Sequence, residues 1–226
     1  FRRAHLAREV GVLYAHALDV AASAVDVLWR PTLDPAELER VVSWFDQRSA
    51  RRAGAGPWAG AARGRNLILI QVESLQSFVL DMAVAGQPVM PLLDGWRQQG
   101  VWFSNVTDQT EQGRSSDAEL TTQVSLLPLS AGAAAFRRGG NRFRGLAGAL
   151  SEEGYHTVSA VPFDGSFWNR RVTHRAFGYA EQLFVQAFAP GEAIGWGLND
   201  QDFLDQMATR LERLPQPFAA WMITLS

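Results

Sequence analysis

The sequence predicts an α/β fold, a mostly parallel sheet with helices on both faces. Short apolar runs of strand length alternate along the chain with segments that carry apolar residues at helical spacing. The runs are continuous rather than alternating, which is typical of strands buried on both faces. A length of 226 residues with 47% hydrophobic residues is enough for one sizeable domain and a helical lead-in.

The first 65 residues are predicted to form a lead-in and a linker. Residues 10–29 form an apolar run that one His and two Asp interrupt, so we expect an amphipathic helix and not a membrane span. A second helix is predicted over 34–45, with Asp34 as its N-cap followed by Pro. Residues 48–66 are rich in Arg, Gly and Ala without periodicity, which is typical of a linker.

From residue 66 the predicted strands and helices alternate. The apolar runs predicted as strands are 66–72, 101–106, 155–161, 181–185 and 218–225. The segments predicted as helices are 91–100, 144–154, 167–178 and 199–214. The first three of these helices end at a Gly, which is a frequent helix stop.

Charge and cysteine content restrict the function classes. A formal net charge of −2 gives no electrostatic basis for a nucleic-acid partner. Because the chain has no Cys, it has neither a disulfide framework nor a thiolate site, and this leaves the compartment open.

Candidate catalytic residues follow two of the predicted strands. In open parallel sheets functional residues gather at the carboxyl ends of the strands. Glu73 comes directly after the strand 66–72, and is either a metal ligand or an ordinary polar residue at the strand's exit. Ser115 and Ser116 begin a predicted helix, where unpaired N–H groups favour an anion. A serine there is either a nucleophile or an N-cap.

The means of activating such a serine is also restricted by the sequence. None of the four His lies in a spaced catalytic signature, and there is no Gly-rich phosphate-binding loop. A serine without a base is commonly activated by a divalent cation, so a carboxylate and a serine together are more informative than either alone.

Three blocks of sequence carry a resemblance to a known family. The blocks are ILIQVESLQSF, DQTEQGRSSDAELTTQVSLLPL and GSFWNRRVTHRAFGY. In this order and spacing they resemble the lipoteichoic acid synthase family, which are membrane-anchored phosphoglycerol transferases of the alkaline phosphatase/sulfatase superfamily. The resemblance implies that 66–226 is the N-terminal portion of a sulfatase-like catalytic domain, incomplete at its C-terminus, and that 1–65 is a helical lead-in and linker.

The resemblance assigns a role to four residues. Glu73 matches a metal ligand, and Ser115 matches the nucleophile, which also binds the metal and is a threonine in the best-known members. Trp168 and Arg170 match residues that hold the glycerophosphate head group, and an Arg fork suits two phosphate oxygens. Without the resemblance, Trp168 reads as core and Arg170 as a surface charge. Ser116 is then left for the capping role, and Val161 stands where the family often has a His.

The implied reaction is metal-dependent phosphoglycerol transfer. The cofactor is Mn²⁺ or Mg²⁺, with further ligands, including an Asp-His pair, beyond residue 226, so the chain alone is expected to be inactive. The donor is a phosphatidylglycerol-type lipid and the acceptor a glycan or polyol. The membrane is reached through a segment outside this chain, and the catalytic domain is extracellular or periplasmic.

Three alternatives stay open from the sequence. They are a phosphoethanolamine transferase, a phospho- or sulfo-ester hydrolase of the same superfamily, and a non-catalytic sensor that keeps a phosphoglycerol pocket. A sulfatase of the usual type needs a C/S-x-P-x-R context to make formylglycine, and the serine pair lacks it.

Overall fold

The computed structural model describes residues 11–28, 34–52 and 56–225, and the chain divides into two compact units, 1–61 and 62–226. The assignment of the first part as a lead-in to a catalytic domain stays a prediction.

The first unit contains two helices. Helix α2 spans Val12–Leu28 and α3 spans Pro35–Arg52. The predicted N-cap is confirmed, because the Ala36 N–H donates to Asp34 Oδ1 at 3.3 Å. The linker prediction was wrong for 48–52, which continue α3, since Arg, Ser and Ala are adequate helix formers and the first Gly comes later. Within the described ranges, no helix has the length and apolarity needed to cross a bilayer.

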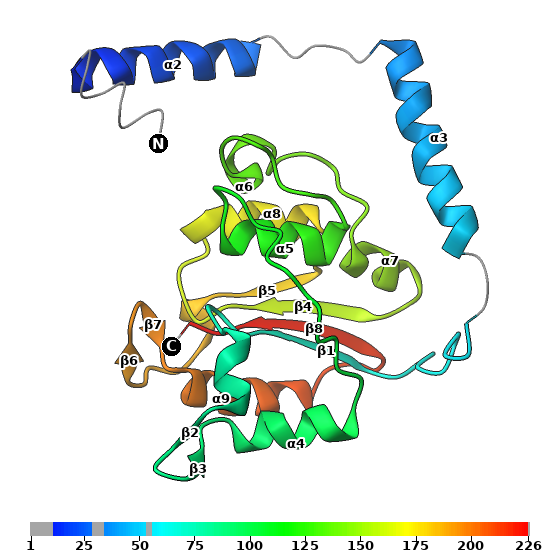
Figure 1. Ribbon diagram of the computed structural model, residues 1–226, viewed down its shortest axis with the longest axis vertical. Helices are drawn as coiled ribbons and strands as arrows, with labels where there is room; N and C mark the ends of the chain where they lie inside the picture. Colours follow the sequence, from blue (N-terminus) through cyan, green and yellow to red (C-terminus); the bar gives the residue numbers. More distant parts are fainter. Residues whose placement is uncertain (1–10, 29–33, 53–55, 226) are drawn as a thin grey trace. The chain divides into compact units, whose positions relative to one another are not determined.

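The second unit is built on a four-stranded parallel sheet (Figure 1). Its strands, in spatial order, are β1 (Leu67–Gln71), β8 (Phe218–Ile223), β4 (His156–Ala160) and β5 (Glu181–Leu183). Strand β8, the last in the chain, lies between β1 and β4, and its Trp221 is in register with Leu69 of β1 and with Ser159 of β4. All three pairings are parallel, as predicted.

Helices cover both faces of this sheet, which confirms the predicted fold class (Figure 1). Figure 1 shows α5 (Ser115–Val124), α7 (Leu146–Glu152) and α8 (Arg170–Ala176) over one face, and α4 (Pro91–Gln99) and α9 (Asp200–Leu211) over the other. The alternate side chains of β8 enter two separate apolar clusters. Phe218 and Met222 pack with α9, whereas Trp221 and Ile223 pack in the cluster that includes α5.

Short elements connect these layers. They are η1 (Ser77–Asp81), α6 (Ala134–Arg137), η2 (Phe167–Asn169), η3 (Val185–Ala187) and two small antiparallel pairs, β2 (Ala83–Val84) with β3 (Gln87–Pro88) and β6 (Ala193–Ile194) with β7 (Gly197–Leu198). The antiparallel pairs were not predicted, because strands of two residues are too short to show a pattern in the sequence.

Two strand predictions need correction. The run 101–106 forms no strand; Val101, Phe103 and Val106 are each more than 70% exposed. The run 66–72 does contain β1, but β1 is an edge strand with largely exposed side chains and not a buried one. An apolar run predicts extended backbone, but it carries no information on whether a neighbouring strand or helix covers it.

Candidate active site

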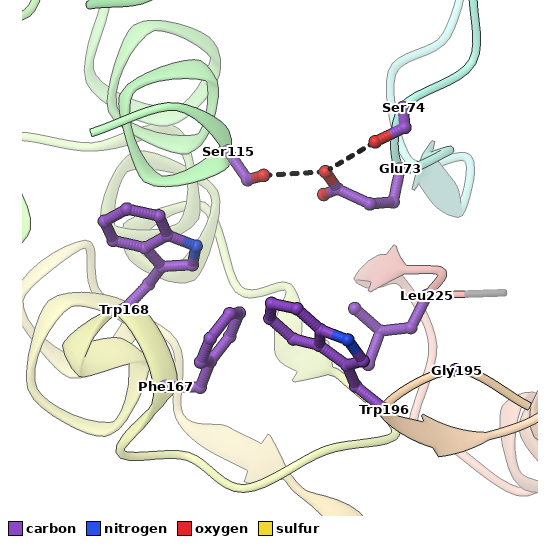
Figure 2. Close-up of a pocket in the computed structure, with 8 residues that line it drawn as sticks. All are labelled: Glu73, Ser74, Ser115, Phe167, Trp168, Gly195, Trp196 and Leu225. Carbon is purple, nitrogen blue, oxygen red and sulfur yellow. Dashed lines mark hydrogen bonds between the residues drawn. The ribbon is translucent and has the colours of Figure 1, made fainter. Parts of the chain in front are cut away.

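The structure brings Glu73 and Ser115 together at the carboxyl end of the sheet. The Ser115 hydroxyl donates to Glu73 Oε1 at 2.8 Å, although 42 positions separate the two residues (Figure 2). Glu73 is held by β8, because its N–H donates to the Thr224 hydroxyl at 3.1 Å, and the Thr224 N–H donates to the Gln71 carbonyl at 3.1 Å. Both Glu73 and Ser115 are half-buried, so a ligand can reach them.

A tight loop sets the direction of Ser115 at the start of α5. The buried Asp117 carboxylate accepts hydrogen bonds from the Gly113 N–H at 2.8 Å and the Glu111 N–H at 3.0 Å. A Cβ atom at position 113 would collide with that carboxylate, so this close approach requires glycine. Asp117 therefore folds the loop back onto α5 and leaves Ser115 as the first helical residue.

Ser116 does not act as the N-cap, and that prediction was wrong. Ser116 is the second residue of α5, and its buried hydroxyl donates to the Gly113 carbonyl at 2.7 Å. An N-cap side chain instead accepts from the backbone N–H groups of the first turn. The capping position belongs to Arg114, whose side chain makes no capping bond in the described structure. Ser116 therefore stabilises the loop by donating to the carbonyl of Gly113.

A cavity of about 350 Å³ opens beside the Ser115–Glu73 pair. It is lined by Glu73, Ser74, Ser115, Phe167, Trp168, Gly195, Trp196 and Leu225 (Figure 2). Trp168, predicted to contact substrate, is among them, and its ring lies 5.9 Å from that of Phe167, which in turn lies 5.1 Å from Trp196. One wall of the cavity is therefore polar and the other aromatic, a combination typical of ligand sites.

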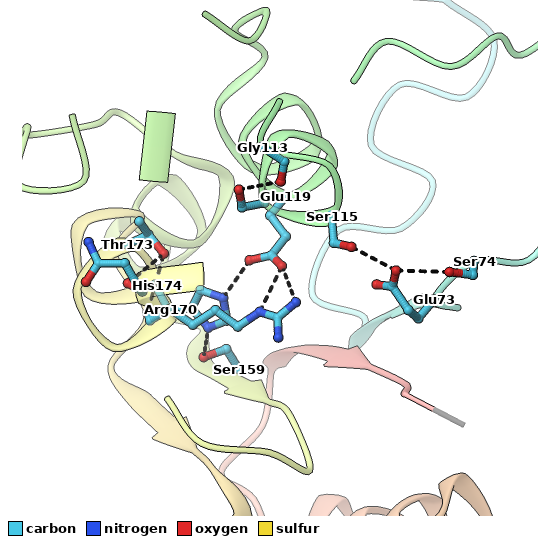
Figure 3. Close-up of polar contacts among 11 residues, drawn as sticks. Glu73, Ser74, Gly113, Ser115, Glu119, Ser159, Arg170, Thr173 and His174 are labelled. Atoms are coloured by element: carbon cyan, nitrogen blue, oxygen red, sulfur yellow. Dashed lines mark hydrogen bonds and ion pairs between the residues drawn. The ribbon is translucent and has the colours of Figure 1, made fainter. Parts of the chain in front are cut away.

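Arg170 lies outside the described lining of this cavity. Its side chain is 0% exposed, and its Nε and Nη2 donate to Glu119 Oε1 at 2.9 and 2.7 Å (Figure 3). The guanidinium carbon lies 5.5 Å from the centre of the Phe167 ring, which is one of the rings that line the cavity. Within the described structure Nη1 has no hydrogen-bond partner. The predicted role of Arg170 in head-group binding stays a prediction.

A buried charge network, formed by Glu119, Arg170, His174 and Ser159, lies behind Ser115. The two His174 ring nitrogens lie 3.2 Å from Glu119 Oε2 and 3.0 Å from the Ser159 hydroxyl oxygen (Figure 3). Burial opposes ionisation of Glu119, but the charge of Arg170 and the hydrogen bond from His174 hold the pKa of this carboxyl below its ordinary value. The network joins α5 to α8 and to β4.

This network was not predicted from the sequence, although the spacing of its residues carries a signal. Ser115 and Glu119 are four residues apart on one predicted helix, and Arg170 and His174 are four apart on another. Residues at this spacing share a helix face, so the second member of each pair faces the same way as a candidate site residue. Val161, which stands where the family often has a His, is fully buried in the apolar cluster with Trp221.

Unusual backbone conformations gather at the cavity. Six described residues other than glycine have positive φ, and four of them border the site: Ser74 (56°), Arg114 (46°), Trp168 (53°) and Asn169 (56°). Such conformations cost about 1–3 kcal/mol each when the residue is not glycine, and they persist where the surroundings impose them. All four are, or are next in sequence to, Glu73, Ser115 or Trp168.

The metal-binding capacity of the site is partial. Nowhere in the described ranges do three His, Cys, Asp or Glu side chains gather as a metal site. The oxygens at the cavity are those of Glu73, Ser115 and Ser74, whose hydroxyl donates to Glu73 Oε1 at 3.3 Å. A donor set of oxygens alone suits a hard divalent cation such as Mg²⁺ or Mn²⁺, so the residues present fit part of such a site.

The fold and this site define a class of protein. Residues 65–226 match the model of the Sulfatase family, and the chain belongs to that family of enzymes. Over 228 aligned residues it is 31% identical to the lipoteichoic acid synthase-like protein YvgJ of Bacillus subtilis, an alignment that covers 100% of the chain and 37% of YvgJ. Over 173 residues it is 35% identical to lipoteichoic acid synthase 1 of the same organism, covering 74% of the chain and 27% of that protein.

A solved structure of a lipoteichoic acid synthase has the same fold. The lipoteichoic acid synthase LtaP from Listeria monocytogenes superposes with a TM-score of 0.72 at 26% identity, covering 74% of the chain and 42% of LtaP. These comparisons confirm the predicted resemblance to lipoteichoic acid synthases and the sulfatase-like fold. The chain spans well under half the length of each of these relatives.

Proposed function

We propose that the protein transfers phosphoglycerol from a phosphatidylglycerol-type lipid to a glycan or polyol acceptor, with Ser115 as the nucleophile. The observation that carries the proposal is the 2.8 Å hydrogen bond between Ser115 and Glu73 at the floor of the cavity. The relatives support it, since two of them are lipoteichoic acid synthases and a third is a lipoteichoic acid synthase-like protein. Ser115 is also the first residue of α5, and a helix N-terminus favours negative charge on the reacting oxygen.

A divalent cation is part of this proposal. Glu73 and the Ser115 oxygen would hold Mg²⁺ or Mn²⁺ together with ligands from outside this chain. When bound, such a cation favours ionisation of the serine hydroxyl and offsets charge on phosphoryl oxygens.

The reaction has two displacement steps in which Ser115 first gains and then loses the phosphoryl group. The Ser115 oxygen attacks phosphorus, the bond from phosphorus to the diacylglycerol oxygen breaks, and diacylglycerol leaves with the proton that the serine lost. An acceptor hydroxyl then attacks the same phosphorus, the bond to Ser115 breaks, and the acceptor's proton returns to the serine. The negative charge of both transition states develops next to the α5 N-terminus.

Trp168 and Arg170 would orient the head group. The Trp168 ring lines the aromatic wall, where it can pack against the glycerol carbons. Arg170 uses Nε and Nη2 on Glu119, which leaves Nη1 as the donor that we assign to a phosphoryl oxygen. Because the donor is a membrane lipid, we place the catalytic domain at the outer face of the cytoplasmic membrane, attached through a segment outside this chain.

The test is release of diacylglycerol from a fluorescent phosphatidylglycerol analogue by the whole protein. Ser115→Ala is expected to abolish release, because it removes the atom that forms the covalent intermediate, and Ser115→Thr is expected to retain part of it. Ser116→Ala is the matched control and is expected to remain active. If Ser115→Ala turned over like the parent, Ser115 would not be the nucleophile.

The alternatives are separated in the same assay. Faster consumption of a phosphatidylethanolamine analogue would indicate a phosphoethanolamine transferase. Release of free glycerophosphate irrespective of an added acceptor would indicate a hydrolase. Binding of the lipid analogue without turnover by the whole protein would indicate a sensor domain.

A further inference from the structure

A strongly basic segment lies next to the cavity. Residues 120–151 contain four arginines and no Asp, Glu or Lys, in a chain whose formal net charge is −2. The four are Arg137, Arg138, Arg142 and Arg144, and all are exposed. We call residues 136–144 the arginine loop.

The segment that leads into the arginine loop, residues 132–135, is hydrogen-bonded to residues close in sequence to Ser115 and to Trp168. On the Ser115 side, Gln112 Oε1 accepts from the Gly132 N–H at 2.7 Å. On the Trp168 side, Asn169 Nδ2 donates to the Ala135 carbonyl at 2.7 Å. Figure 1 shows α6, where the loop begins, on the same side of the sheet as α5 and α8. Phe136, the first residue of the loop, lies against Trp168, which lines the cavity, so the loop borders the cavity at this residue.

A row of aromatic rings continues from this loop across the cavity. The Phe136 ring lies 5.9 Å from Trp168, Trp168 lies 5.9 Å from Phe167, and Phe167 lies 5.1 Å from Trp196. The two ends of the row are solvent-exposed, with Phe136 61% and Trp196 65% exposed. Both end rings are therefore accessible to an apolar surface beside the cavity.

We propose that the arginine loop, with Phe136 and Trp196, is a docking surface for an anionic phospholipid bilayer, a step that rests on the proposed function for the identity of the lipid drawn into the cavity. Arginines attract an anionic lipid surface, and aromatic rings are favoured at the level of the head groups. Docking in this way brings the head group of a membrane lipid to Trp168 and Ser115 without removing the lipid from the bilayer.

The aromatic residues favour a bilayer over a soluble polyanion. A phosphate-rich polymer would satisfy the arginines equally well, but it offers no apolar region for Phe136 and Trp196. A bilayer interface provides both charge and apolar depth. The dependence of binding on Phe136 therefore distinguishes the two.

The experiment measures partition of the 226-residue chain onto vesicles by flotation. The parent is expected to bind vesicles that contain phosphatidylglycerol, to bind pure phosphatidylcholine vesicles weakly, and to lose binding as salt is added. Each arginine at an anionic surface is worth about fivefold in affinity, so the triple variant Arg138→Gln/Arg142→Gln/Arg144→Gln should bind more than tenfold more weakly. Phe136→Ala should also weaken binding, by a smaller factor.

The matched control removes three exposed arginines at the amino ends of β1 and β8, Arg63→Gln/Arg65→Gln/Arg213→Gln. The inference is overturned if this control loses as much affinity as the loop variant, or if the loop variant binds like the parent. It is also overturned if Phe136→Ala has no effect while polyphosphate displaces the parent, since the loop would then be a polyanion site. Melting curves check that each variant is folded.

Failure of this inference is distinguishable from failure of the proposed function. In the whole protein, the loop variant is expected to turn over a short-chain, monomeric donor like the unmodified protein, and to turn over the vesicle-embedded donor more slowly. An unmodified whole protein that binds anionic vesicles without turnover would refute the proposed function and leave the docking surface in place. Normal turnover of both donors by the loop variant would refute the docking surface alone.

Discussion

Two side-chain clusters stand one helical turn apart on α5, and they differ in almost every respect. Ser115 and Glu73 are half-buried and face a cavity, with hydrogen-bonding capacity left for a ligand. Glu119, one turn later, is 1% exposed, and its two carboxylate oxygens are hydrogen-bonded to Arg170 and His174 (Figure 3). The comparison indicates a division of roles. The buried charges fix α5 against α8 and β4. Because α5 is held in this way, Ser115 and Glu73 can keep hydrogen-bonding groups free for a ligand.

The largest effect is expected from breaking the buried cluster. Glu119→Gln leaves the Arg170 guanidinium buried without a counter-charge, which should cost about 3–5 kcal/mol of unfolding free energy. Urea unfolding measures this loss, and Glu152→Gln, an exposed carboxylate on α7, should stay within about 0.5 kcal/mol of the parent. A Glu119→Gln protein as stable as the parent would show that the network has no structural role.

The next effect is the acid response of the same cluster. The folded-state pKa of Glu119 lies below its ordinary value because Arg170 and His174 outweigh the cost of burial. Its stabilising contribution is therefore complete above the ordinary carboxyl pKa of about 4.3 and is lost as pH falls through the lower folded-state pKa. Unfolding free energy measured from neutral pH downwards should fall more steeply in the parent than in Glu119→Gln. Parallel curves would contradict this assignment.

A smaller effect is expected at the loop between the two clusters. Ser116→Ala removes a buried hydrogen bond to the Gly113 carbonyl, which should cost about 1 kcal/mol. Thermal unfolding measures the loss, and Ser151→Ala, at an exposed serine of α7, is the comparison and should stay within about 0.5 kcal/mol of the parent. Activity should persist, because the Ser115 hydroxyl is untouched. A loss of activity without loss of stability would mean that the hydroxyls had been assigned in the wrong order.

The smallest change in stability is expected at the open pair. Ser115→Ala removes a half-exposed hydrogen bond, so its unfolding free energy should stay within about 0.5 kcal/mol of the parent while transfer is abolished. Ser115→Ala is thus expected to combine the smallest loss of stability with a complete loss of transfer. A large loss of stability in Ser115→Ala would remove the contrast between the two clusters.

The sequence was sufficient where the signals are local. The end of an apolar strand placed Glu73, and the start of a polar helix placed Ser115, because both positions follow from patterns a few residues long. The helical stripe of α9 was likewise predicted, and Phe203, Met207 and Leu211 are buried as expected.

The sequence was insufficient where the determining contacts are distant. Glu119 and Arg170 are 51 positions apart in the sequence and form an ion pair. No local pattern shows that the guanidinium binds this carboxylate and does not line the cavity. The predictions that 66–72 and 101–106 are buried strands fail for the same reason, since an apolar run does not show which other element covers it. The place of Ser116 as second residue of the helix depended on one detail of the loop, the hydrogen bonds that Asp117 makes to Gly113 and Glu111.

The positive-φ residues around the cavity constrain how this protein can be made more heat-tolerant. A substitution that relieves an unfavourable backbone conformation raises the stability of the folded state. Arg114→Gly is such a substitution, because glycine has no Cβ and tolerates the positive φ at this position. Glycine also adds freedom to the unfolded chain and loosens the turn that delivers Ser115. The backbone strain that Arg114→Gly would relieve therefore lies next to Ser115, so a gain in stability at this turn conflicts with the fixed geometry of the reactive serine.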